Sequence, residues 1–288
     1  MTQFQTAGTG VVDVGRRTQI HSSAEVVFAK PGTVTIGDYC QLGPGVRIVC
    51  SGGDVLIGDW TTLHDRCLVL SGRSVTIGEH CWFGQHCVID GTGGIAIGNG
   101  VRVGMYSQLW THVAAGEQME GCTLIGERPV LIEDDVWLVG SCIVASGVTL
   151  GRRLVALISS NITKSWPGSM VIAGSPAAPK SGLSFYRDVT LDEKWCMLTQ
   201  WLHDAVAEIG GASLDDTTPG LLIFSLPSCA DRVAFVRDRE TAYAMRESMS
   251  DVTVCCVEDK TYNKRVNESE QRILKFLAGN KARFRAAP

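Results

Sequence analysis

An aliphatic side chain recurs every six positions through much of the chain, from about residue 34 to residue 162. Two positions before most of these lies a second small or apolar residue. Residues two apart on a strand point to the same side, so each pair predicts a short strand with one buried face. The repeating positions are Ile36, Leu42, Ile48, Ile57, Leu63, Val69, Ile77, Phe83, Ile89, Ile97, Val103, Leu109, Ile132, Leu138, Val144, Leu150, Ala156 and Ile162.

The six-residue period predicts a solenoid of parallel strands. Glycine follows many repeat positions, as at Gly37 and Gly78, and it eases the turn that must come after each short strand. Three strands and three turns then make a coil of about eighteen residues, and neighbouring coils bury each other's apolar edges. A helix would need a spacing of three or four, and a sandwich would need turns every eight to twelve residues.

The period breaks between His112 and Arg128. Residues 113–128 are long, polar and glycine-bearing, and they predict a loop that protrudes from the stacked coils. Long loops inserted into a rigid scaffold tend to carry function, although a tolerated surface excursion is the plain alternative. Trp110 and His112 stand where this loop leaves the coils. Trp110 either stacks on a sugar ring or caps the core.

A second, smaller α/β domain is expected after the repeats end. We place the boundary between residues 1–182 and 183–288. A stripe of apolar positions predicts an amphipathic helix over Leu191–Ile209, ended by two glycines. Further expected elements are strands at Leu221–Leu226, Val233–Val236 and Val252–Val257, and a helix at Glu268–Leu277.

Composition narrows the class of protein. The 288 residues are 45% hydrophobic and 19% charged, as in a compact globular chain, and the net charge of −4 argues against nucleic acid as a partner. The start lacks a signal peptide, the apolar run Leu221–Phe224 is too short to span a membrane, and the eleven cysteines mostly occupy core positions. We therefore expect a reduced, cytoplasmic protein, with Lys281–Arg285 as a weak candidate for peripheral membrane contact.

Three segments carry a family resemblance: PVLIEDDVWLVGSCIVASGVTLGRRL from Pro129, then NITKSWPG, then VIAGSPAAPK ending at Lys180. With the Thr111-His112 pair before the loop, they resemble the hexapeptide-repeat acyltransferases, in particular the sugar O-acetyltransferase branch. The resemblance covers roughly residues 30–180. It implies a mainly β fold, a left-handed parallel β-helix, with acetyl-CoA as acyl donor, no metal, and a homotrimer whose active sites lie between subunits.

The resemblance also implies roles for particular residues. His112 would be the general base that takes the proton of the acceptor hydroxyl, a task that suits the pKa of histidine. The positions implied for the acetyl-CoA cleft are Gly140, Ser141, Ile158, Thr163, Lys164, Pro176 and Lys180. Isoleucine at 158, where the family has alanine, makes that wall bulkier.

The acceptor pocket departs from the family pattern. Gly84 stands where related enzymes carry an asparagine, and Asp90 lies one residue out of register with an acceptor-binding aspartate. We take Asp90, Trp110 and Glu127 as candidates for binding the acceptor, with solvated loop charge as the alternative for Glu127. The C-terminal domain resembles tails of acetyltransferases from bacterial surface-polysaccharide clusters, through TYNKR, ESE and ARF near its end.

The sequence therefore predicts an acetyl-CoA-dependent O-acetyltransferase acting on a sugar hydroxyl in the synthesis of lipopolysaccharide, capsule or exopolysaccharide. An N-acetyltransferase acting on a nucleotide-linked amino sugar is the alternative. A γ-type carbonic anhydrase with zinc on His64, His80 and His86 fits less well, because His80 and His86 fall on adjacent faces of one coil. A non-catalytic β-helix scaffold would not explain the coenzyme segments.

Overall fold

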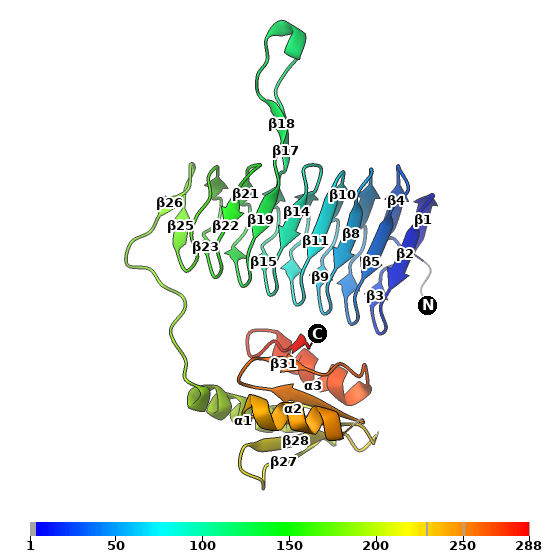
Figure 1. The fold of residues 1–288 in the computed structure, drawn as a ribbon, viewed down its shortest axis with the longest axis vertical. Coiled ribbons are helices and arrows are strands. Elements are labelled where there is room, and N and C mark those ends of the chain that lie inside the picture. The colour runs from blue at the N-terminus through cyan, green and yellow to red at the C-terminus, as the bar shows by residue number, and fades with distance from the viewer. Residues whose placement is uncertain (1–3, 229, 250, 288) are drawn as a thin grey trace. The chain divides into compact units, whose positions relative to one another are not determined.

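The computed structural model describes residues 4–228, 230–249 and 251–287, in two compact units, Met1–Tyr186 and Arg187–Pro288. The first unit is a left-handed parallel β-helix of stacked coils (Figure 1). The sequence prediction of this fold class is confirmed, and the coils begin earlier than the visible period, at Gln5. Among the described residues, no helix is long and apolar enough to cross a membrane.

Three parallel sheets form the faces of the β-helix, and each coil passes through them in the order A, B, C. Sheet A contains β1 (Gln5–Gly8), β4 (Glu25–Phe28), β7 (Arg47–Cys50), β10 (Leu68–Ser71), β13 (Val88–Asp90), β16 (Gln108–Leu109), β21 (Ile143–Val144) and β24 (Asn161–Ile162). Sheet B contains β2 (Val11–Val14), β5 (Thr33–Ile36), β8 (Asp54–Ile57), β11 (Ser74–Ile77), β14 (Ile95–Ile97), β19 (Val130–Ile132) and β22 (Thr149–Leu150). Sheet C contains β3 (Gln19–Ile20), β6 (Gln41–Leu42), β9 (Thr62–Leu63), β12 (Trp82–Phe83), β15 (Arg102–Val103), β20 (Trp137–Leu138), β23 (Val155–Ala156), β25 (Val171–Ala173) and the antiparallel β26 (Ala178–Pro179).

The six-residue positions form the core of this unit. Ile48, Val69 and Ile89 pair in register on successive coils, and each is fully buried. Every coil places a side chain at the same inward position. Similar side chains therefore stack in columns that fill the interior. Cysteines occupy the second inward position, two residues before the six-residue positions: Cys67 and Cys87 are buried, and each thiol donates to a carbonyl oxygen of the next coil. None of the ten described cysteines is in a disulfide bond.

Carboxylates join the coils at the turn between sheets B and C. The Asp38 carboxylate accepts the Arg16 N–H at 2.5 Å, and the Asp59 carboxylate accepts the Asp38 N–H at 2.8 Å. Asp134 does the same for the N–H of Asn99, at 2.7 Å. These contacts satisfy turn amides that the sheets leave unpaired, because the strands are too short to engage them.

The loop predicted at 113–128 is an arm that projects from the β-helix (Figure 1). It leaves after β16 as β17 (His112–Ala114), passes a short 3-10 turn, η1 (Gln118–Glu120), and returns as β18 (Ile125–Glu127), antiparallel to β17. We call residues 112–128 the arm. Its base is therefore an ordered two-stranded ribbon, and His112 is its first residue.

The second unit has a six-stranded mixed sheet and three helices. Its strands, in sheet order, are β27 (Ser213–Asp215), β28 (Leu221–Ser225), β29 (Arg232–Val236), β30 (Val252–Cys256), β31 (Thr261–Tyr262) and β32 (Arg285–Ala286), and its helices are α1 (Leu191–Glu208), α2 (Arg239–Ser248) and α3 (Glu268–Ala278). The sequence reading missed α2. Its apolar stripe is weak, since Ala242 is its one fully buried residue, and periodicity detects helices through that stripe.

The TYNKR and ESE motifs close this second unit. Tyr262 is fully buried, and the side-chain oxygen of Asn263 accepts the N–H of Val254 on β30. The buried Glu270 carboxylate accepts the Thr253 hydroxyl at 2.8 Å and the Arg265 N–H at 2.9 Å. A buried carboxylate is costly unless it is satisfied in this way. The motif residues therefore stabilise the fold of the second unit.

Candidate active site

His112 lies at the corner where sheet A turns into sheet B, and its imidazole is paired with Asp90 of the preceding coil. His112 Nδ1 lies 2.8 Å from Asp90 Oδ2. The histidine side chain is 39% exposed, whereas Asp90 is fully buried. The geometry gives a carboxylate behind the ring and solvent access in front of it, an arrangement that holds an imidazole in a fixed orientation.

Asp90 is held by a set of donors on two threonines. Its Oδ2 accepts the Thr111 N–H and the Thr111 hydroxyl, both at 2.8 Å, and its Oδ1 accepts the Thr92 hydroxyl at 2.5 Å. Burial alone would raise the pKa of Asp90, but the hydrogen bonds from Thr92, Thr111 and His112 more than offset it, so the pKa lies below its usual value. An ionised Asp90 requires Nδ1 of His112 to carry the proton.

This environment corrects the prediction that Asp90 contacts the acceptor. The carboxylate is inaccessible and both its oxygens are engaged within the chain. Asp90 lies in register with the half-buried Leu70 on the outer face of sheet A, and the side chains of Thr92, Thr111 and His112 surround it there. Periodicity gives little signal for this burial, because the residue in register with Asp90 on the preceding coil, Leu70, is only half-buried.

The two other acceptor candidates lie beside His112. Trp110 is half-buried, with its ring centroid 5.9 Å from that of His112 and its Nε1–H donated to Gln108. Glu127 is the cross-strand partner of His112 in the β17–β18 ribbon, which places their side chains on the same face. Its carboxylate lies 3.3 Å from Nε of Arg73, a residue that sequence reasoning missed.

The residues predicted for the acetyl-CoA cleft gather on the last coils of the β-helix. Gly140 and Ser141 form the turn between sheets C and A, and Ile158 lies in the same turn of the next coil, where the Ser159 N–H donates to the Gly140 carbonyl at 2.9 Å. Ile158 is 66% exposed. These residues flank one edge of the outer face of β21 and β24.

Thr163 and Lys164 lie at the opposite edge of that face. Both are exposed, directly after β24 at the sheet A–sheet B corner, two coils beyond His112. The Lys164 ammonium sits 4.6 Å above the ring of Trp166. Pro176 and Lys180 are exposed at the end of the β-helix, on either side of β26. The last coils thus offer an exposed apolar strip with a cation at one corner.

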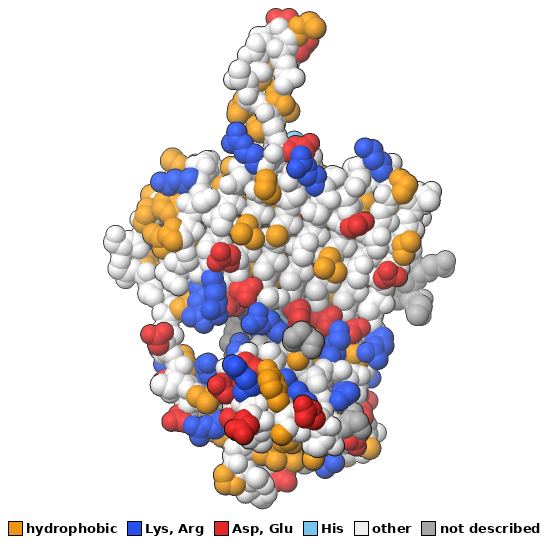
Figure 2. Space-filling model, in the orientation of Figure 1, with side chains coloured by type: hydrophobic (Ala, Val, Ile, Leu, Met, Phe, Trp, Pro, Cys, Tyr) orange, Lys and Arg blue, Asp and Glu red, His pale blue; other side chains and the backbone are white. Residues whose placement is uncertain are grey.

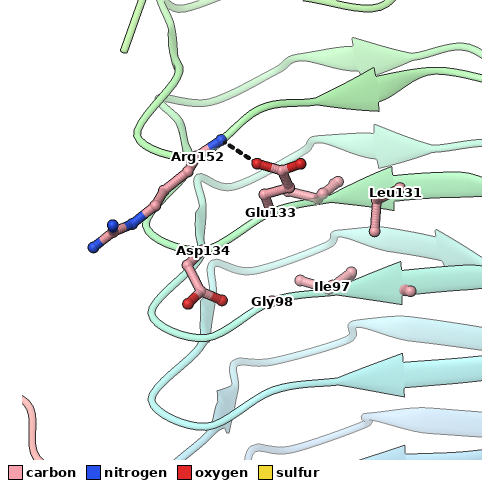
Figure 3. A pocket seen from close by; sticks show the side chains of 8 residues that line it. Ile97, Gly98, Leu131, Glu133, Asp134 and Arg152 are labelled. Carbon is pink, nitrogen blue, oxygen red and sulfur yellow. Dashed lines mark hydrogen bonds between the residues drawn. The ribbon is translucent and has the colours of Figure 1, made fainter. Parts of the chain in front are cut away.

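Two other groups are distinct from this site. His80 stacks on Trp60, whereas His64 and His86 contact Trp82 and Tyr106 at a different corner, and no cluster of three metal-ligating side chains occurs in the described part of the chain. A shallow pocket of about 400 Å³ on sheet B is lined by Leu131, Glu133, Asp134 and Arg152, with Glu133 accepting the Arg152 N–H at 2.8 Å (Figure 3). It contains none of the predicted site residues.

In sequence, the chain is similar to two bacterial proteins, one of which is named as an acetyltransferase. Nodulation protein L of Rhizobium meliloti is 34% identical over 108 residues, which cover 37% of this chain and 58% of that protein. WcaF of Escherichia coli, named as an acetyltransferase of colanic acid biosynthesis, is 31% identical over 105 residues, covering 36% and 56%. The chain thus spans a little over half the length of these relatives.

Similarity in structure supports the same fold. The crystal structure of the polySia-specific acetyltransferase NeuO matches with a TM-score of 0.50 and 17% identity, over 68% of this chain and 95% of that one. No family model matches the chain. The match to NeuO supports the β-helix fold of this chain.

Proposed function

We propose, from the premise that its β-helix is homologous to that of the hexapeptide-repeat acyltransferases, that this protein is an acetyl-CoA-dependent O-acetyltransferase acting on a sugar hydroxyl. The observation that carries the proposal is the Asp90–His112 pair at the foot of the arm. The names of the relatives, a colanic acid biosynthesis acetyltransferase and a galactoside O-acetyltransferase, support a glycan acceptor in bacterial surface-polysaccharide synthesis.

His112 is the general base in this proposal. With its Nδ1 proton donated to the ionised Asp90, the imidazole presents the unprotonated Nε2 to solvent. Nε2 takes the proton of the acceptor hydroxyl as the hydroxyl oxygen forms its bond to the acetyl carbon. The carbon–sulfur bond of the thioester then breaks, and the imidazolium, stabilised by the buried carboxylate, gives its proton to the departing thiolate. A base positioned in this way contributes about 10²–10⁴ to the rate.

The last coils fit the donor. Acetyl-CoA supplies an acetyl thioester as the activated acyl group. Its chain is partly apolar and its nucleotide end is anionic, and the exposed Ile158 and Ile143 offer apolar contact while Lys164 offers a cation. We assign Gly140, Ser141, Thr163, Pro176 and Lys180 to the same cleft. Backbone at glycine and serine allows close approach of a ligand, and a lysine ammonium suits phosphate.

We propose a homotrimer as the working assembly, with each active site between two subunits. Exposed apolar side chains support it, because all three outer faces of the coils carry them: Leu131 on sheet B is 42% exposed, Trp137 on sheet C 41%, and Ile143 on sheet A 41%. Such side chains on every face favour covering by another chain. Sedimentation equilibrium of the purified protein should give the mass of a trimer. A monomer at micromolar concentration contradicts this assembly.

The variant His112→Ala tests the mechanism. Turnover should fall at least a hundredfold while the affinity for acetyl-CoA stays nearly unchanged, because the imidazole acts on the acceptor proton. His21→Ala is the matched control, since His21 is an exposed histidine in a turn of the first coil. The acceptor is found by following acetyl-CoA consumption against nucleotide sugars and oligosaccharide repeat units. Near-normal turnover of His112→Ala would exclude His112 as the general base. An N-acetylated product would show that the enzyme acylates an amine and not a hydroxyl.

A further inference from the structure

A row of cations follows the corner at which sheet A turns into sheet B. Its members are Lys30, Arg73, Arg128 and Lys164, in the turns after β4, β10, β16 and β24. These are alternate strands of sheet A, so neighbouring members of the row stand about 10 Å apart. Figure 2 shows Lys and Arg side chains spaced along the edge of the β-helix from which the arm rises.

The turns between these cations carry short side chains. They read Ser-Gly-Gly at 51–53, Gly-Thr-Gly-Gly at 91–94 and Ala-Ser-Gly at 145–147. A Cβ on Gly52 would lie 3.7 Å from Cδ of Lys30, and one on Gly147 would lie 3.1 Å from Cδ of Arg128. The cation's stem therefore lies across the glycine of the next coil in both cases, which gives the row a supported geometry.

The charge of the row is largely uncompensated. Lys30, Arg128 and Lys164 are exposed, and no carboxylate pairs with them in the described part of the chain. Glu127 engages Nε of Arg73 and leaves its two terminal amino groups for another ligand. Outside the arm, two carboxylates border these turns: Asp54, which accepts the Thr33 N–H at 2.7 Å, and the buried Asp90, which is paired with His112. Such a row in a chain of net charge −4 points to an anionic ligand.

His112 stands within the row, between Arg73 and Lys164. The proposed function assigns Lys164 and the coils around it to the donor, so the other direction, toward Arg73 and Lys30, remains for the acceptor. We propose that the acceptor is a linear acidic glycan, whose carboxylates pair with Arg73 and Lys30 while its chain crosses the small-residue turns between them. This inference takes the position of the reacting atoms, beside His112, from the proposed function. It takes the charge of the substrate from the row of cations.

Binding of a defined acidic oligosaccharide, without acetyl-CoA, tests the row by itself. The probe is an octamer of galacturonic acid, and its methyl ester, of equal length without the charge, is the control ligand. Calorimetry should give at least tenfold weaker binding of the ester, and weaker binding of the acid when sodium chloride rises from about 50 to 300 mM. Equal affinity for acid and ester overturns the proposal.

Substitutions then locate the charge. Lys30→Gln and Arg73→Gln should each weaken the acid octamer about two- to fivefold, as expected for exposed charge pairs, and the double variant should combine both losses. Arg66→Gln is the matched control, because its stem also lies across a glycine, 3.2 Å from a Cβ on Gly45, but at a different corner. An equal loss with Arg66→Gln means that overall charge, not the row, binds the glycan.

The outcome is separable from that of the proposed function. Loss of octamer affinity in Lys30→Gln, with acetyl-CoA binding unchanged, supports the row whether or not His112 proves to be the base. A neutral acceptor turned over as fast as an acidic one of the same length overturns the inference and leaves the acetyltransferase intact. A single-stranded oligonucleotide or anionic vesicles bound as tightly as the octamer would also overturn it. The row would then bind any polyanion and would not be specific for a glycan.

Discussion

Asp90→Asn tests the link between the buried carboxylate and His112. The carboxylate accepts five hydrogen bonds, from the N–H and hydroxyl of Thr92, the N–H and hydroxyl of Thr111, and Nδ1 of His112. An amide keeps the shape but replaces one acceptor oxygen with a donor. If the NH₂ group faces Thr111 and His112, Nδ1 must accept and Nε2 carries the proton, which is the wrong form for a base.

If the NH₂ group faces Thr92 instead, the N–H of Thr92 loses its acceptor and the imidazolium loses its counter-charge. One orphaned buried donor costs about 1–3 kcal/mol of stability. Loss of a correctly held base lowers turnover about 10²-fold or more, and a hundredfold corresponds to about 2.7 kcal/mol of activation free energy. We therefore expect Asp90→Asn to lower turnover about a hundredfold with little change in the affinity for acetyl-CoA.

The assay is the initial rate of thiol release from acetyl-CoA with the acceptor found in the screen, for wild type, Asp90→Asn, His112→Ala and the double variant. Because Asp90 acts through His112, the double variant should be no slower than His112→Ala alone. A further large loss in the double variant, or wild-type turnover in Asp90→Asn, would refute the reasoning. Circular dichroism confirms that each variant is folded.

Three further predictions concern stability and reactivity. The pKa of Asp90 is lower in the folded state, so the difference in unfolding free energy between wild type and Asp90→Asn should be constant at neutral pH and shrink below about pH 4, as urea titrations will reveal. Gly104→Ala would place a Cβ 1.9 Å from a carbonyl oxygen and should cost about 2 kcal/mol or more in thermal unfolding, whereas Gly126→Ala, with open space, should cost under about 0.5. Burial raises the pKa of Cys40 to about 12, so at pH 8 a thiol reagent should modify exposed Cys196 first and leave Cys40 unmodified until unfolding; early labelling of Cys40 in a peptide map contradicts this.

The acidic-glycan inference adds a practical consequence for the acceptor screen. If Arg73 and Lys30 bind carboxylates, repeat units that contain uronic or other acidic sugars should outperform neutral ones of the same length, and more so at low ionic strength. The arm contributes the carboxylate that engages Arg73. Glu127 therefore influences how much of the Arg73 guanidinium is presented to a ligand.

The six-residue period by itself determined the β-helix. Side chains such as Ile48, Val69 and Ile89 recur because each coil needs the same inward slot, so a local rule applied many times specifies the global fold. The sequence also predicted the position of the arm, because a long polar insertion cannot lie inside stacked coils. The period is not visible before residue 34, because the side chains of β1 and β2 are mostly exposed and escape the apolar pattern.

The tertiary structure decided what the sequence order could not. Asp90 and His112 are 22 residues apart, and the stacking of two coils places their side chains 2.8 Å from each other. Asp90 lies in an outward position in register with the half-buried Leu70, so its burial comes from Thr92, Thr111 and His112 around it, which a six-residue period does not reveal. The cation row is also invisible in one dimension, because Lys30 and Arg73 become neighbours only when alternate coils bring the same corner into line. Sequence periodicity specifies which side chains point inward or outward. The stacking of the coils specifies which side chains of different coils come into contact.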